Sequence, residues 1–102
     1  MKITVYCENP EDPAYEKAIG ALAENAEIVL LPAATCARTI KSKAAGTVIY
    51  FDPAAIPEEK IVDLGSRTQE PWGVLDRRGA ILDPAALIHS GAADYVGPAL
   101  FK

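Results

Sequence analysis

The sequence predicts a single α/β domain in which short buried strands alternate with helices. Three observations support this prediction. Apolar, β-branched runs suited to strands covered on both faces recur along the chain, as in residues 3–7 and 47–51. Segments of helical composition separate these runs. Asp-Pro pairs begin at Asp12, Asp52 and Asp83, each shortly before such a segment. A chain of 102 residues is long enough for one hydrophobic core and too short for two.

The first half of the chain contains two expected strands and two expected helices. Residues 3–7 form the first strand, and a helix begins at Asp12-Pro13, because aspartate caps free N–H groups and proline suits the first helical position. Residues 28–31 form the second strand, which Pro32 ends. Residues 33–44 have helical composition with a basic end, typical of a helix C-terminus.

The second half repeats this pattern. We expect strands at residues 47–51, 72–75 and 95–97, and a helix from about residue 57 to 64 that Gly65 closes. A further helix begins at Asp83-Pro84, buries Leu87 and Ile88, and ends at Gly91.

Five strands alternating with helices favour a three-layer, flavodoxin-like sandwich with a parallel sheet in the order 2-1-3-4-5. This order calls for another helix after the last strand, and residues 99–102 are too few to form it. We therefore expect either that the 1–102 domain is the N-terminal part of a longer protein or that another chain covers this face.

Composition excludes several classes of partner. The chain has 10 Lys and Arg against 14 Asp and Glu, and its net charge of −4 opposes attraction to nucleic acid or to an anionic membrane. No apolar run approaches the roughly 20 residues that span a bilayer, and no signal-peptide pattern precedes the first strand. We expect a cytoplasmic protein.

Acidic residues follow three of the expected strands, at the edge of the sheet where ligands gather in this fold. Glu8 follows the first strand, Asp52 the third and Asp76 the fourth. These carboxylates could converge on Mg²⁺ or Ca²⁺, which prefer oxygen ligands. The alternative that we favour is three separate, solvated loop acids, with Asp52 starting a turn before Pro53.

The segment Gly91-Ala92-Ala93-Asp94-Tyr95-Val96-Gly97 resembles the turn and last strand of response-regulator receiver domains. In that family an aspartate after the third strand accepts a phosphoryl group with the help of Mg²⁺. The resemblance makes Asp52 the phosphoacceptor candidate and Glu8 one of the metal ligands. Three positions depart from the family: Cys7 replaces a carboxylate, Asp76 a hydroxyl, and Pro98 the lysine.

These departures remove the groups that stabilise a phosphate. Pro98 offers neither a cation nor an N–H group, and an ionised Asp76 would repel the new charge. The resemblance therefore implies a pseudo-receiver: a non-enzymatic regulatory or protein-interaction module of a signalling protein, with no cofactor. The alternative is an atypical receiver that is phosphorylated on Asp52 and uses Mg²⁺.

Cys7 raises a third alternative. A cysteine directly after the first strand resembles the phosphocysteine of sugar-phosphotransferase IIB domains and the nucleophile of small tyrosine phosphatases. However, residues 8–13 contain three acids and two prolines, which repel a phosphate and reduce the number of N–H donors. We favour a buried structural thiol.

The resemblance also indicates where a partner would bind. Tyr95 matches a position on the partner-binding surface of receivers, beside the fourth and fifth strands, and Pro98 lies at the end of the same surface. We expect a protein partner or a fused effector domain there, or a homodimer through this face.

Overall fold

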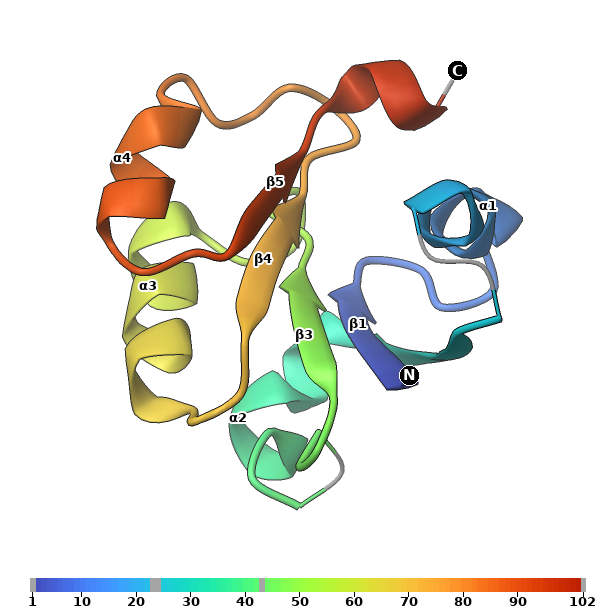
Figure 1. Cartoon of the computed structure of the whole chain (residues 1–102), viewed down its shortest axis with the longest axis horizontal. Helices are drawn as coiled ribbons and strands as arrows, with labels where there is room; N and C mark the ends of the chain where they lie inside the picture. The colour runs from blue at the N-terminus through green and yellow to red at the C-terminus, as the bar shows by residue number, and fades with distance from the viewer. Residues whose placement is uncertain (1, 23–24, 43, 102) are drawn as a thin grey trace.

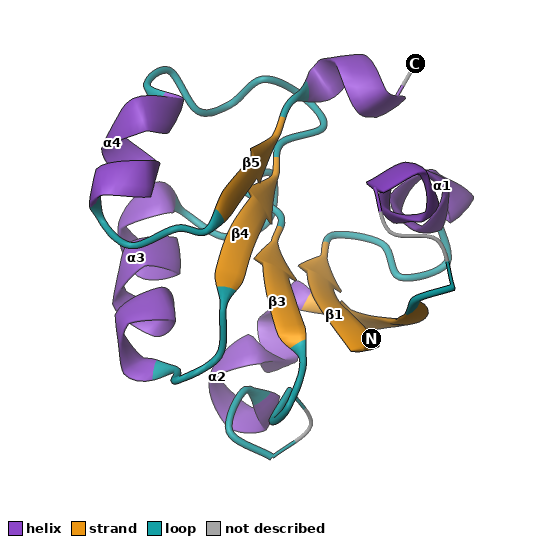
Figure 2. Ribbon diagram, viewed as in Figure 1, coloured by secondary structure: helices purple, strands orange, loops and turns teal. Residues whose placement is uncertain are grey.

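Five parallel strands form one sheet in the computed structural model, which describes residues 2–22, 25–42 and 44–101. The strand order is β2-β1-β3-β4-β5, and all four pairings are parallel (Figure 2). The strands are β1 (Lys2–Cys7), β2 (Glu27–Pro32), β3 (Val48–Phe51), β4 (Trp72–Leu75) and β5 (Asp94–Val96). The predicted α/β class and flavodoxin-like order are confirmed.

Helices lie on both faces of this sheet (Figure 1). Helix α1 (Pro13–Leu22) lies on one face beside the C-terminal 3₁₀ turn η2 (Pro98–Phe101). The other face carries the 3₁₀ turn η1 (Ala33–Thr35) and the helices α2 (Cys36–Thr39), α3 (Glu58–Arg67) and α4 (Pro84–His89). In the described part of the chain, no helix is both long and apolar enough to cross a bilayer.

The helix expected over residues 33–44 is much shorter in the structure. After η1, the described residues of this segment are α-helical only over Cys36–Thr39. The Thr35 hydroxyl donates to the Pro32 carbonyl and the Thr39 hydroxyl to the Thr35 carbonyl. Such bonds compete with a regular helix. The chain then reaches β3 through turns, with Gly46 at a φ of +76°.

Gly65 does not end α3, so that prediction was wrong. The helix continues to Arg67, and Gly65 is buried where α3 meets β4. A side chain at this position would overlap the indole ring of Trp72. The glycine is therefore needed for the close approach of α3 to the sheet and not for stopping the helix.

Ile88 is a second correction, because the sequence placed it on the buried side of α4. The helix buries Leu87 and leaves Ile88 47% exposed. The last strand also lacks the long helix that usually follows it in this strand order: η2 is the last element in the described residues.

Alternate residues of the strands pack into two hydrophobic clusters, one on each face of the sheet. In β1, Ile3, Val5 and Cys7 face α1, whereas Tyr6 faces the layer of α2, α3 and α4. This alternation follows from the two-residue period of a strand. Burial on both faces explains why the central strands are largely apolar.

One row of residues crosses three strands on the α1 face. Tyr50 of β3 pairs in register with Gly73 of β4, and Gly73 pairs with Asp94 of β5. The Tyr50 hydroxyl donates to Asp94 Oδ2 at 2.9 Å. A Cβ on Gly73 would lie 2.9 Å from Tyr50 Cε1 and 2.8 Å from the Asp94 carbonyl oxygen. Glycine therefore leaves the space that lets the tyrosine ring span β4.

Candidate functional site

The acidic residues predicted from the sequence lie along the carboxyl edge of the sheet. β1 ends at Cys7, β3 at Phe51 and β4 at Leu75, so Glu8, Asp52 and Asp76 each directly follow a strand. Parallel strands bring these ends to one side of the molecule. The three residues differ in burial: Asp52 and Asp76 are 0% exposed, and Glu8 is exposed.

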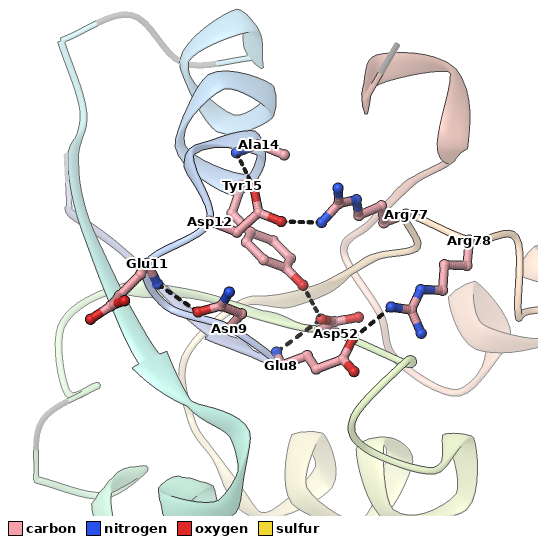
Figure 3. Close-up of polar contacts among 9 residues, drawn as sticks. All are labelled: Glu8, Asn9, Glu11, Asp12, Ala14, Tyr15, Asp52, Arg77 and Arg78. Atoms are coloured by element: carbon pink, nitrogen blue, oxygen red, sulfur yellow. Dashed lines mark hydrogen bonds and ion pairs between the residues drawn. The ribbon is translucent and has the colours of Figure 1, made fainter.

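Asp52 is enclosed by hydrogen-bond donors (Figure 3). The Tyr15 hydroxyl, which comes from α1, donates to Oδ2 at 2.6 Å, and the Glu8 N–H donates to the same oxygen at 3.1 Å. The Ala54 N–H donates to Oδ1 at 3.0 Å, which makes the turn expected before Pro53. The carboxylate is thus satisfied inside the protein, and neither oxygen is free for a reagent in solution.

Asp76 has a matching set of donors on the neighbouring strand. The Tyr95 hydroxyl donates to Oδ2 at 2.7 Å, the Ile81 N–H to Oδ2 at 2.9 Å, and the Ala80 N–H to Oδ1 at 2.7 Å. These bonds shape the loop after β4. Each of the two buried carboxylates therefore accepts one tyrosine hydroxyl and two backbone N–H groups.

The tyrosine donors remain protonated across the physiological range. Burial raises the pKa of Tyr95 to about 12, and the hydrogen bond and charge of Asp76 add to the effect. Burial, then the hydrogen bond to Asp52, raises the pKa of Tyr15 as well. A neutral hydroxyl beside a carboxylate donates a strong, charge-assisted hydrogen bond.

Two arginines from the loop after β4 reach over this edge toward the loop between β1 and α1 (Figure 3). Arg78 forms an ion pair with Glu8 at 3.0 Å, and Arg77 forms one with Asp12. The Arg77 guanidinium also lies 6.0 Å from the centroid of the Tyr15 ring. Both arginines thus bind exposed or half-exposed carboxylates and tie the two loops together.

The three candidate metal ligands do not form one ligand set. Asp52 and Asp76 use their oxygens for separate groups of internal donors, and Glu8 points to Arg78. In residues 2–22, 25–42 and 44–101, no three His, Cys, Asp or Glu side chains are grouped so as to hold a metal ion. The favoured alternative of three solvated loop acids is wrong for Asp52 and Asp76, which are fully buried.

Cys7 is buried at the end of β1, and its Sγ lies 3.8 Å from the Leu31 carbonyl oxygen. Burial, followed by the charges of Asp52 and Asp12, raises the pKa of Cys7 to about 11. Burial also raises the pKa of Cys36 to about 11. Both thiols are therefore protonated near neutral pH, which makes them poor nucleophiles.

Tyr95 and Pro98, the candidate partner residues, are both half-buried. Tyr95 packs against the core on the α3 and α4 face while its hydroxyl binds Asp76. Pro98 begins η2 and lies against Gly79, where an added Cβ would be 3.4 Å from Pro98 Cγ. Each residue thus has contacts within the domain.

A cavity of about 370 Å³ lies beside this acidic edge, and no sequence pattern indicated it. It opens between the ends of β1 and β2 and the start of α3, next to the point where the strand order reverses. Its wall consists of Cys7, Glu8, Pro32, Ala33, Ala34, Cys36, Ala37, Ala55, Ile56, Pro57, Lys60 and Leu64.

The sequence interpretation also missed Tyr15. Its position in the first turn of α1, directly after the loop that follows β1, is the signal that could have indicated it. That turn lies at the carboxyl edge of the sheet.

No family model matches the chain, no curated protein matches it, and no solved structure matches it.

Proposed function

We propose that the chain is a non-enzymatic regulatory or protein-interaction module of a cytoplasmic signalling protein, related to receiver domains but without their phosphorylation switch. The observation that carries this proposal is the environment of Asp52. Its carboxylate is 0% exposed and accepts hydrogen bonds from Tyr15, Glu8 and Ala54.

Phosphorylation of Asp52 would disrupt this arrangement. The carboxylate would have to lose the 2.6 Å bond to Tyr15 before an oxygen could attack a phosphodonor. A phosphoryl group would then add about −1.5 to −2 charges to a fully buried position. Two cations at this edge of the sheet, Arg77 and Arg78, are already paired with Asp12 and Glu8.

The module would act through a protein partner or a fused effector domain. Net negative charge argues against nucleic acid as that partner. We assign this contact, including the contact in a homodimer, to the surface beside β4 and β5. Tyr95 lies there on the side of α3 and α4, and Pro98 lies just beyond the end of β5, where η2 begins on the α1 side.

A phosphorylation assay tests the proposal. The protein is incubated with Mg²⁺ and acetyl phosphate, and its intact mass is measured beside that of an active receiver domain in the same reaction. We expect the receiver to gain a phosphoryl group and this chain to gain none. A phosphoryl group that appears on the wild type and is absent from D52N would refute the proposal in favour of the atypical receiver.

A further inference from the structure

The cavity beside the acidic edge has an apolar wall formed by small side chains. Four alanines, two prolines, Ile56 and Leu64 supply most of it, and the two thiols are protonated near neutral pH. Its volume of about 370 Å³ falls in the range typical of small-molecule sites, about 300–1,000 Å³. Its place at the reversal of strand order is where ligands bind in open α/β sheets.

Two charged side chains, Glu8 and Lys60, also line the cavity. Glu8 is neutralised by Arg78 at 3.0 Å. Among the ion pairs of the described residues, none involves Lys60. Lys60 and Cys36 both line the cavity, and the positive charge of Lys60 opposes the rise in the pKa of the Cys36 thiol.

The N-terminal end of α3 is a second source of positive charge beside the cavity. Pro57, the residue before the helix, provides no side-chain cap for the first-turn N–H groups, and it lines the cavity. The N-terminal end of a helix carries partial positive charge. Glu58 and Glu59 in the first turn offset part of this charge, so Lys60 is the main attraction for an anion at the cavity.

We propose that this cavity binds a small monocarboxylate with an apolar body, whose carboxylate pairs with Lys60 while its hydrocarbon part contacts the alanine and proline wall. A phosphate fits less well, because Lys60 is a single cation and the exposed acids Glu58 and Glu59 in the first turn of α3 disfavour a second negative charge nearby. This inference goes beyond the proposed function and does not depend on it, because Asp52 takes no part in the site.

Hexanoate is a suitable probe for a titration of the ¹⁵N-labelled full chain by NMR. We expect saturable shifts at the amides of Ala33, Ala34, Ala37 and Ala55, with a Kd of about 1 mM for a ligand of this size. Hexanamide has nearly the same shape but no charge. It should bind at least about fivefold more weakly, and inorganic phosphate should not shift these amides.

Variants of Lys60 test whether its charge contributes to hexanoate binding while the fold is kept. K60Q should weaken hexanoate binding about fivefold or more, and K60R, which keeps the cation, should bind within about twofold of the wild type. The control is K17Q, which removes a cation from the exposed face of α1 and should leave binding unchanged. All three substitutions are at exposed positions, so the fold should persist.

Three results would each overturn the inference: no saturable shift at the cavity amides, equal binding of hexanoate and hexanamide, or equal binding by K60Q and the wild type. Tighter binding of phosphate than of hexanoate at the same amides would overturn the assigned ligand class.

Discussion

Replacing Tyr15 by phenylalanine should lower the free energy of unfolding by about 1.5–3 kcal/mol, the range for a lost hydrogen bond to a charged group. The Tyr15 hydroxyl donates to Asp52 Oδ2 at 2.6 Å, and both side chains are buried. Phenylalanine fills the same space and supplies no donor. The remaining donors to Asp52 are the N–H groups of Glu8 and Ala54, which already bond to the carboxylate in the wild type.

Tyr6 provides a matched control for this substitution. Its side chain is as buried as that of Tyr15, but its hydroxyl bonds to the neutral Thr39 hydroxyl at 2.8 Å. Y6F should therefore cost only about 1 kcal/mol. The difference between the two variants isolates the contribution of the Asp52 charge from the general effect of removing a tyrosine hydroxyl.

Urea unfolding at pH 7, followed by circular dichroism, measures both losses. With an m value of about 1.5 kcal/mol/M, Y15F should lower the midpoint by about 1–2 M and Y6F by about 0.7 M. Equal losses in Y15F and Y6F, within about 0.5 kcal/mol, would refute the claim that Tyr15 stabilises a buried charge on Asp52.

Two further predictions concern packing and pH. G73A should destabilise the fold by about 1–3 kcal/mol, because the new methyl group would press on the Tyr50 ring, whereas G20A, in an open position on α1, should stabilise it by about 0.5–1 kcal/mol. Thermal melts measure both effects. Equal effects of the two substitutions would contradict the close packing of the Tyr50 ring over Gly73. Burial raises the pKa of Cys7 and Cys36 from 9.0 to about 11. The contribution of the two thiols to the free energy of unfolding is therefore fully present below pH 9. It falls as the pH rises to about 11, because the unfolded chain loses its thiol protons first. Urea midpoints across this window should fall less in the C7A/C36A double variant, and an identical fall would argue against the thiols.

The sequence predicted the sheet because each strand carries its own signal. Runs such as residues 47–51 are almost entirely apolar or β-branched, as strands buried on both faces require, and the helical segments between them indicate parallel crossovers. The errors arose where the outcome depends on tertiary contacts. Gly65 resembles a helix stop in the sequence, but its role comes from Trp72 on the neighbouring strand.

The candidate site shows the same limit more strongly. Sequence position correctly placed Glu8, Asp52 and Asp76 at the ends of strands. It could not show that two of these carboxylates are buried, because their partners Tyr15 and Tyr95 are 37 and 19 residues away along the chain. The cavity could not be predicted for a similar reason. Its wall comes from β1, β2, η1, α2 and α3 and from the loops after β1 and β3, none of which has a distinctive motif.

The central position of the first strand has a consequence for how the chain folds. β1 lies between β2 and β3, so its backbone is not fully paired until residues 48–51 have been synthesised. Every strand pairing is parallel and joins segments far apart in sequence, which slows folding relative to helical bundles of similar size. A nascent chain released before Phe51 would therefore leave one edge of β1 unpaired and exposed to other polypeptides, which makes early termination an aggregation hazard.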